Sequence, residues 1–354
     1  MGRKYLERDV FQAAYNRLLK VYQEGHRVVV AFSAGKDSGV CMELAIMAAR
    51  ATGRLPVEAM LRDDEIYYPG TAEYAMRMYE RPEVKLHWIS SRNASANVYN
   101  RETPYYWVYD DRLRPSEWVR EPPPFIQWTP NNINLYTIIN STQFPPPHEK
   151  KLCAVVGIRA QESMKRLYTI HSIKGARSFA PDDPRVFNLY PIYDWSDGDI
   201  WKAINDNKWD YNSAYDVLNK MGVPRGKQRI AQAAMTHLGT DVLQIAARAW
   251  PRWFDRVSDR LPGVRQVVYY GERVLQPQRK IGETWEETFY RTCITEAPTW
   301  IAKRAETAIS KLLAHHSTHS EKPFPDVSPC KACAANDIGS WKGLAHALYS
   351  GDPH

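Results

Sequence analysis

The sequence is poor in cysteine and contains no long hydrophobic run. Its 354 residues include five cysteines, and no apolar stretch approaches the roughly 20 residues that a membrane-spanning helix needs. The first ten residues, MGRKYLERDV, lack the apolar segment of a secretory signal. Membrane-spanning and secreted proteins are therefore disfavoured, and we expect a cytoplasmic protein.

The small number of cysteines also argues against a framework of disulfides. Thiols stay reduced in the cytoplasm, so metal binding or catalysis is the more common use of clustered cysteines there. Cys41 and Cys153 lie within apolar segments, and we expect both to be core residues. Cys293, Cys330 and Cys333 all lie in the last third of the chain.

The composition is that of a soluble globular protein with an excess of positive charge. Hydrophobic residues make up 44% and charged residues 25%, and the formal net charge is +7 with a pI of about 9.0. A basic chain favours an acidic partner, such as a nucleotide or a nucleic acid. The 12 Trp and 21 Tyr can stack on bases, although packing in a core explains them as well.

Hydrophobic patterning predicts an α/β fold over the first 210 residues. The run RVVVAF at 27–32 is typical of a strand that is covered on both faces of a parallel sheet. Strands then alternate with helices, an order that indicates a doubly wound parallel sheet. The expected strands are 27–32, 56–62, 84–90 and 151–159, and the expected helices are 9–25, 39–51, 68–81 and 196–207.

Two parts of the chain depart from this alternation. Residues 91–150 are rich in Pro, Asn, Trp and Tyr, with EPPPF and FPPPH within them, and we interpret them as an insertion or lid. From residue 211 to 354 the pattern is mainly helical. We therefore predict a nucleotide-binding α/β domain over 1–210 and a C-terminal region over 211–354 that can carry a metal or partner site.

The turn after the first expected strand has the composition of a polyphosphate-binding loop. It reads SAGKDS from Ser33 to Ser38. Small residues let the backbone approach a bulky anion, and the amides at the start of a helix favour negative charge. Lys36 adds a positive charge, and Asp37 can help to hold a magnesium ion. The Walker spacing, G-x-x-x-x-G-K-S/T, is absent.

This loop resembles the PP-loop, S-G-G-x-D-S, of the adenine-nucleotide alpha-hydrolase-like superfamily, with Ala34 in place of one glycine. Two further blocks resemble phosphoadenylylsulfate (PAPS) reductase-like proteins of that superfamily. GIRAQESMKR at 157–166 is similar to their G-I-R-x-x-E-S-x-x-R block, and YPIYDWSDGDIW at 190–201 to P-I-x-D-W-x-x-x-D-I/V-W. The three blocks occur in the family order and span most of the first 210 residues.

The resemblance implies a magnesium-dependent enzyme that binds ATP and releases pyrophosphate, by adenylation or by sulfur transfer. It implies catalytic roles for Lys36, Asp37 and Arg159. Asp63 and Asp64 follow the second expected strand, where such sheets present ligands, so Asp64 joins Asp37 as a candidate for magnesium. The implied nucleotide-binding residues are Ser33, Ala34, Gly35, Lys36, Asp37, Ser38, Asp63, Gly157, Arg159, Glu162, Ser163, Arg166, Asp194 and Arg229.

Two other functions stay open. PAPS reductases carry a nucleophilic cysteine in an E-C-G-I/L-H context; this sequence lacks that motif, although its late C-x-x-C can still support thiol chemistry. The tail CKACAANDIGSWKGL resembles a poorly characterised branch found in bacteria and mobile elements, often encoded beside a ParB-like partner protein. A non-catalytic nucleotide-binding regulator that acts with such a partner or with DNA is therefore the second alternative.

The C-terminal region contains a candidate metal site. Cys330 and Cys333 form a C-x-x-C, and His315, His316 and His319 precede them. Histidines at this spacing can complete a tetrahedral zinc site with the two thiols. A four-cysteine site for zinc or an iron–sulfur cluster, completed by Cys293 or Cys153, is a second interpretation. Reduced thiols without a metal are the third.

A basic segment provides the argument for DNA or tRNA. Arg252, Arg256 and Arg260 recur every four residues, as on a helix that follows a phosphate backbone. Asp255 and Asp259 lie three residues after two of these arginines. A solvated helix with internal salt bridges is the simpler interpretation.

Overall fold

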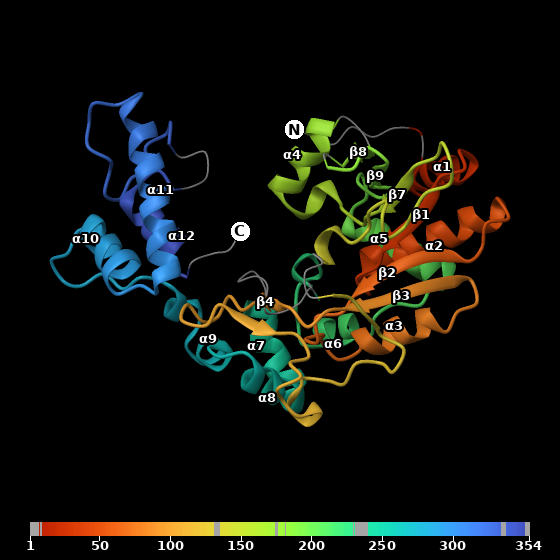
Figure 1. Cartoon of the computed structure of the whole chain (residues 1–354), viewed down its shortest axis with the longest axis horizontal. Coiled ribbons are helices and arrows are strands. Elements are labelled where there is room, and N and C mark those ends of the chain that lie inside the picture. The colour runs from red at the N-terminus through yellow and green to blue at the C-terminus, as the bar shows by residue number, and fades with distance from the viewer. Residues whose placement is uncertain are drawn as a thin grey trace. The chain divides into compact units, whose positions relative to one another are not determined.

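The chain folds into two compact units, each of which is described by itself. The computed structural model describes residues 7, 9–130, 135–173, 176–180, 182–228, 230, 240–333 and 338–350. The first unit comprises Met1–Asn93, Val108–Ser116 and Arg120–Gln232. The second comprises Ala94–Trp107, Glu117–Val119 and Ala233–His354. Figure 1 shows the helices and strands of both units.

A seven-stranded sheet forms the centre of the first unit, in the order β6-β3-β2-β1-β7-β9-β8. All neighbouring strands are parallel except β8 and β9. The strand order reverses between β1 and β7, so the predicted doubly wound parallel sheet is confirmed. The strands are β1 Arg27–Ala31, β2 Val57–Arg62, β3 Val84–Ser90, β6 Gln127–Trp128, β7 Leu152–Val155, β8 Arg177–Phe179 and β9 Val186–Leu189.

Helices pack against this sheet, and several begin at a side-chain cap. Ser196 accepts a hydrogen bond from the Asp199 amide at the start of α5. Asp9 caps α1 in the same way through the Phe11 amide. The helices of this unit are α1 Val10–Gln23, α2 Lys36–Ala51, α3 Thr71–Tyr79, α4 Met164–Ile173, α5 Asp197–Asn207 and α6 Ala214–Lys220. Short 3₁₀ turns occur at Pro115–Glu117, Leu135–Thr137, Ala160–Glu162 and Arg225–Lys227.

The central strand β1 is buried on both faces, as its continuous hydrophobicity predicted. Val28 and Val30 belong to the main core, which also contains Leu18 of α1. Val29 points to the opposite face, where Phe144 contributes to a second cluster. This division follows from the alternation of side chains along a strand. The sheet is thereby fixed between two apolar layers, with its carboxyl edge left for the loops.

The second unit is mainly helical and includes a small hairpin. The hairpin pairs β4 Ala94–Ala96 with β5 Tyr105–Trp107. Gly263 has a φ of 93° and leaves no room for a side chain, because a Cβ there would lie 2.0 Å from the Tyr99 carbonyl oxygen. The helices are α7 Thr240–Ala249, α8 Pro251–Arg260, α9 Val264–Tyr270, α10 Trp285–Phe289, α11 Thr299–Ser317 and α12 Trp341–Tyr349, with a 3₁₀ turn at Glu272–Leu275 and a π-helical turn at Tyr290–Thr295.

The division between the units differs from the domains expected over 1–210 and 211–354. Residues 211–228 belong to the first unit, because Asn212 and Tyr215 bond to the loop after β1. Part of the expected insertion at 91–150 joins the helical unit instead, since the Asn97 amide donates to the Pro262 carbonyl at 3.0 Å. Among the described residues, no helix has both the length and the hydrophobicity needed to cross a bilayer.

The close packing of α2 against α3 gives a test of the fold. A Cβ at Gly39 would lie 2.6 Å from the hydroxyl oxygen of Tyr74, which is fully buried. We expect Gly39→Ala to lower the free energy of unfolding by about 1–3 kcal/mol, the usual cost of overpacking a core. Urea unfolding of the full chain, followed by circular dichroism, measures this change.

Gly198 on α5 is the matched control. It is exposed, and a Cβ there would contact only the Ser196 hydroxyl, at 3.5 Å. Since alanine is the better helix former, Gly198→Ala should leave stability unchanged or raise it by up to about 1 kcal/mol. Equal destabilisation by both substitutions would contradict the packing described.

Candidate functional site

The loop after β1 is closed by its two serines. The Ser33 amide donates to the Ser38 hydroxyl oxygen at 3.2 Å, and the Ser38 hydroxyl donates to the Gly35 carbonyl at 3.0 Å. The two hydroxyl oxygens are 3.1 Å apart. Between them, Ala34 is buried with a φ of 55°, a left-handed conformation that favours glycine. The glycine of the PP-loop pattern at this position therefore has a conformational reason.

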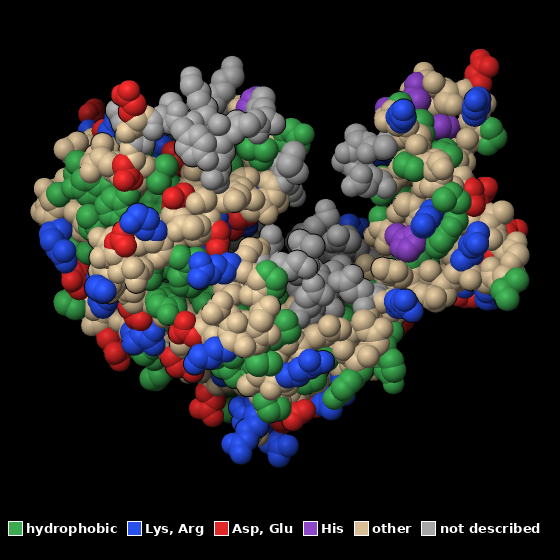
Figure 2. All heavy atoms as spheres, turned by 180° about the vertical axis from the view of Figure 1, so that it is seen from behind, with side chains coloured by type: hydrophobic (Ala, Val, Ile, Leu, Met, Phe, Trp, Pro, Cys, Tyr) green, Lys and Arg blue, Asp and Glu red, His purple; other side chains and the backbone are tan. Residues whose placement is uncertain are grey.

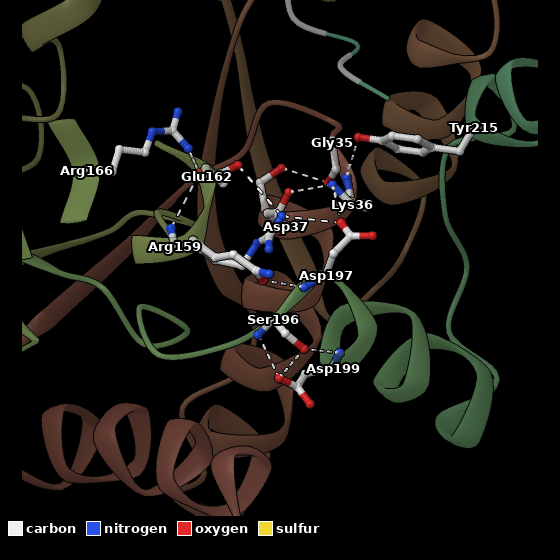
Figure 3. Close-up of polar contacts among 12 residues, drawn as sticks. Gly35, Lys36, Asp37, Arg159, Glu162, Arg166, Ser196, Asp197, Asp199 and Tyr215 are labelled. Carbon is white, nitrogen blue, oxygen red and sulfur yellow. Dashed lines mark hydrogen bonds and ion pairs between the residues drawn. The ribbon is translucent and has the colours of Figure 1, made fainter. Parts of the chain in front are cut away.

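Four charged side chains alternate in sign around the start of α2, and Figure 3 shows them converging. The Lys36 ammonium is 3.2 Å from an Asp37 carboxylate oxygen and 3.3 Å from an Asp197 carboxylate oxygen. The Arg159 guanidinium donates to the other Asp37 oxygen and lies 3.5 Å from Asp197. Each carboxylate thus contacts both cations. We call these four residues the charge cluster.

The sheet topology explains why the charge cluster forms. Lys36 and Asp37 open α2 directly after β1, and Arg159 follows β7. β1 and β7 are parallel neighbours, so their carboxyl ends meet at the point where the strand order reverses, the usual ligand position in such sheets. Asp197 is the first residue of α5. The cations are well shielded from solvent, with side-chain exposures of 6% for Lys36 and 4% for Arg159.

The block after β7 extends the charge cluster by one ion pair. A Glu162 carboxylate oxygen is 3.8 Å from the Arg159 guanidinium, and Glu162 also pairs with Arg166. The Ser163 hydroxyl accepts a hydrogen bond from the Arg166 amide at 3.2 Å. Ser163 therefore stabilises the first turn of α4, while Arg166 is 41% exposed at the rim.

Gly157 shapes the loop through close backbone packing. A Cβ at this position would lie 3.1 Å from the Asp37 carbonyl carbon and 3.1 Å from the Ser38 amide nitrogen. Because both atoms belong to the backbone, neither can move aside without displacing the first turn of α2. The contact that the structure gives Gly157 is therefore with the loop itself.

Two buried residues that the sequence reasoning had not assigned also hold the loop. Tyr215 accepts a hydrogen bond from the Lys36 amide at 3.1 Å, and the side-chain amide of Asn212 donates to the Ala34 carbonyl at 3.1 Å. Burial, together with the nearby Asp37 carboxylate, raises the pKa of Tyr215, so its phenol stays neutral. Both residues lie in the segment YNSAYDVLNK, where no local pattern distinguishes them from the other polar and aromatic residues.

Tyr215 also lines a cavity of about 620 Å³. Trp201, Trp209 and Tyr211 contribute aromatic walls, and Arg225 contributes a charge. This size and this mixture of aromatic and polar groups are typical of a small-molecule site. A cavity of substrate size is therefore joined through one side chain to the loop.

Asp63 and Asp64, which were predicted to face nucleotide or magnesium, have partners within the chain. Asp63 is completely buried; it accepts hydrogen bonds from the Trp88 indole at 2.7 Å and the Tyr109 hydroxyl at 3.0 Å, and it pairs with Arg120. Asp64 accepts from the Arg62 guanidinium at 2.7 Å. Both carboxylates thus fix the segment after β2.

Asp194, which was predicted to bind nucleotide, pairs with α1. Its two carboxylate oxygens accept hydrogen bonds from Arg17 of α1, at 2.8 and 2.6 Å. The carboxylate that reaches Lys36 and Arg159 is Asp197, three residues later. The sequence signal for Asp197 was its place directly after the N-cap Ser196. Arg229 lies outside the described residues.

The cysteines fall into two groups. Cys41, Cys153 and Cys293 are completely buried, and burial raises the pKa of each thiol. The first two are core residues, as predicted. Cys330 and Cys333 belong to the second unit, where they contact His316 and His319. The late C-x-x-C is therefore the group with metal-binding chemistry.

The arginines of α8 bond to the chain itself. Arg256 donates to the Val119 carbonyl at 3.3 Å, and Arg260 donates to the Trp107 carbonyl at 2.5 Å. They thereby hold parts of 94–119 within the second unit. Asp255 pairs with Arg265 at 3.4 Å. Figure 2 shows Lys and Arg side chains interspersed with Asp and Glu on the face that it presents.

Comparison with known families and proteins gives one domain match and one related chain. Residues 27–219 match the family described as "Phosphoadenosine phosphosulfate reductase domain". The curated protein "Uncharacterized protein YbdN" of Escherichia coli (strain K12) is 27% identical over 375 residues, covering 97% of this chain and 88% of its own. The family match includes β1, the loop, β7 and α5, and thus the whole charge cluster.

Two solved structures resemble this chain with low TM-scores and low sequence identity. Candida glabrata FMN adenylyltransferase has a TM-score of 0.37 and 11% identity, with 60% of this chain and 62% of that chain covered. The phosphate complex of the PAPS reductase from Candida auris has a TM-score of 0.36 and 9% identity, with 66% and 98% covered. The match thus spans less than two thirds of the adenylyltransferase chain.

The internal role of Asp63 can be tested by measuring the free energy of unfolding. Asp63→Ala leaves Arg120 without its partner in a buried setting, so we expect a loss of about 3–5 kcal/mol in the free energy of unfolding. The control is Asp111→Ala, since Asp111 is 64% exposed and pairs with Arg92 at 3.4 Å. That substitution should cost less than about 1 kcal/mol. A stable Asp63→Ala protein would contradict the internal role.

Proposed function

The chain belongs to the phosphoadenosine phosphosulfate reductase domain family, a family of adenine-nucleotide-binding enzymes, and from that premise we propose that it binds ATP with magnesium at the charge cluster and cleaves it to release pyrophosphate. The observation that carries the proposal is the alternation of Lys36, Asp37, Arg159 and Asp197 at the start of α2. This arrangement offers cations for phosphate and carboxylates for a hard metal ion in one place.

Charge balance supports a nucleotide that arrives with a metal. Without a ligand the charge cluster is formally neutral, because two cations face two carboxylates. Phosphate oxygens resemble carboxylate oxygens as acceptors, so a polyphosphate can replace Asp37 and Asp197 as the partner of Lys36 and Arg159. The released carboxylates then need a cation of their own, since an unpaired charge in a shielded site is costly. Magnesium meets that need.

The chemistry that follows is nucleotidyl transfer. A nucleophile on the second substrate forms a bond to the α-phosphorus, and the bond to the bridging oxygen breaks with both electrons leaving on pyrophosphate. Lys36 and Arg159 stabilise the charge that develops on the leaving group, and the N-terminus of α2 adds its dipole. Magnesium, which Asp37 and Asp197 would hold, supplies further neutralisation of the phosphate oxygens.

A sulfonucleotide reductase is the second candidate, because the matched family carries that activity in its description. Such an enzyme needs a nucleophilic thiolate. Hydrogen bonds from the Cys333 and Ala332 amides lower the pKa of Cys330. Among the described cysteines, Cys330 is also the one that is not buried, so it is the candidate thiol for this alternative.

The loop lysine provides the first test of nucleotide binding. Lys36→Met removes one charge-assisted contact worth about 1.5–3 kcal/mol, so the affinity for ATP with magnesium should fall by about tenfold to a hundredfold. Isothermal titration calorimetry at fixed salt measures the change. Asp194→Asn is the control: Asp194 pairs with Arg17, away from the charge cluster, so its loss should leave the affinity unchanged. Unaltered binding by Lys36→Met would contradict the proposal.

The role of Asp197 predicts that its substitution raises the affinity for ATP without magnesium and reduces the gain in affinity that magnesium gives. Asp197→Asn removes a competitor for Lys36 and Arg159, so ATP without magnesium should bind more tightly than it binds to the unaltered protein. The same substitution removes a magnesium ligand, so the gain in affinity on adding magnesium should shrink. The same calorimetric titrations, run with magnesium and with a chelator, measure both quantities. If Asp197→Asn lowers both affinities equally, the proposed exchange of partners is wrong.

Product analysis separates the candidate reactions. Pyrophosphate released from ATP and magnesium, with candidate acceptors present, supports ATP cleavage. Sulfite formed from PAPS and a thiol donor, and abolished by Cys330→Ser, would replace that proposal by reduction. Tight nucleotide binding with neither product would point to the regulator.

A further inference from the structure

Four side chains of the second unit bring their metal-binding atoms together. They are His316, His319, Cys330 and Cys333, and the ligand atoms all lie within 4.8 Å of one another. His316 Nδ1 is 3.3 Å from Cys333 Sγ. His319 Nε2 is 3.5 Å from Cys330 Sγ and 3.4 Å from Cys333 Sγ. Figure 2 shows histidine side chains gathered over the part of this unit that contains α11 and α12.

Three of these distances match the edges of a tetrahedron around a zinc ion. Zinc binds thiolate sulfur at about 2.3 Å and imidazole nitrogen at about 2.0–2.1 Å, so neighbouring ligand atoms around it are about 3.3–3.8 Å apart. The three nitrogen–sulfur distances of 3.3, 3.4 and 3.5 Å fall in this range. One ion therefore fits among the four atoms with little movement of the chain.

A second layer of bonds orients the buried histidine. His316 Nε2 is 3.0 Å from the Lys322 carbonyl oxygen, and a carbonyl can only accept, so this nitrogen carries the proton. The lone pair is then on Nδ1, the atom that faces Cys333. An outer hydrogen bond of this kind is the usual partner of a metal-binding histidine.

The local fold explains how distant residues meet. His316 lies in the last turn of α11, and His319 follows its C-cap, Thr318. The Cys333 amide donates to the Cys330 carbonyl at 3.1 Å, which closes a tight turn around the C-x-x-C. The Cys330 amide also donates to the Gly339 carbonyl at 2.7 Å, just before α12. The cluster thus connects the end of α11 to the start of α12.

A small apolar core lies beside the four metal-binding side chains, and the connection between α11 and α12 would stabilise it. Phe324 packs edge-on against His316 and against Trp341, with ring centres 5.3 and 5.4 Å apart. Cys333 and Phe289 belong to the same apolar core as Phe324 and Trp341. Cores of this size commonly need a metal or a disulfide for stability.

We propose that His316, His319, Cys330 and Cys333 hold one zinc ion in a closed tetrahedral site that stabilises the module formed by α10, α11 and α12. Four protein ligands leave no position for substrate, so the role is structural. This set differs from the four-cysteine interpretation, and Cys293 bonds to Thr292 and the Ala345 carbonyl instead. A two-iron cluster places histidines and cysteines on different irons, whereas here His319 Nε2 contacts both sulfurs.

Metal analysis of the purified full chain is the direct test. We expect about one zinc ion per chain, as in other four-ligand structural sites. His319→Ala should lose most of it, and since His319 is exposed, the core beside it stays intact. His315→Ala is the matched control: its ring is 5.0 Å from that of His319, but it is outside the ligand set, so zinc should be retained.

Two further measurements decide the geometry and the purpose. Cobalt substituted for zinc should give the intense visible bands of a tetrahedral site with sulfur ligands. Removing zinc with a chelator should accelerate proteolysis within 285–350, and adding zinc should reverse this. Zinc content that His319→Ala leaves unchanged, or an iron–sulfur spectrum in place of zinc, would overturn the assignment.

The test is independent of the proposed nucleotide chemistry. His319→Ala should leave the affinity for ATP with magnesium unchanged, because the charge cluster belongs to the first unit. Failure of Lys36→Met to weaken ATP binding would contradict the proposed function and would leave the zinc proposal unaffected. Loss of zinc with intact ATP binding is the expected combination.

Discussion

Everything proposed for the first unit depends on the alternation of two cations and two carboxylates at the start of α2. Lys36 and Arg159 are nearly removed from solvent, and Asp37 and Asp197 offset the cost of burying their two charges. The arrangement exists because β1 and β7 are parallel neighbours, so the residues that follow them meet. A site that is neutral when empty and built from exchangeable ion pairs can accept a polyphosphate and a metal ion together.

Much of the charge cluster and of the sheet around it could be predicted from the sequence. RVVVAF is typical of a strand covered on both faces, and the SAGKDS and GIRAQESMKR blocks placed Lys36, Asp37 and Arg159 after expected strands. The partners of Asp63 and Asp194, Arg120 and Arg17, could not be predicted because they are far away in the sequence. No local pattern shows whether an acidic residue after a strand faces a ligand or a buried guanidinium.

In the second unit, too, partners that are distant in the sequence could not be predicted. The spacing of the arginines in α8 suggested a phosphate-binding face, but Arg256 and Arg260 donate to carbonyls of residues 119 and 107. The late C-x-x-C was recognisable, whereas the choice among three histidines was not. His316 and His319 are selected because α11 ends between them, and the sequence did not show where that helix stops relative to each ring.

A crystal structure with a non-hydrolysable ATP analogue and magnesium tests the central claim most directly. The account predicts phosphate oxygens in contact with Lys36 and Arg159, and both Asp37 and Asp197 released from those cations and turned toward the metal. A nucleotide bound elsewhere, with all four ion pairs of the charge cluster intact, would contradict it.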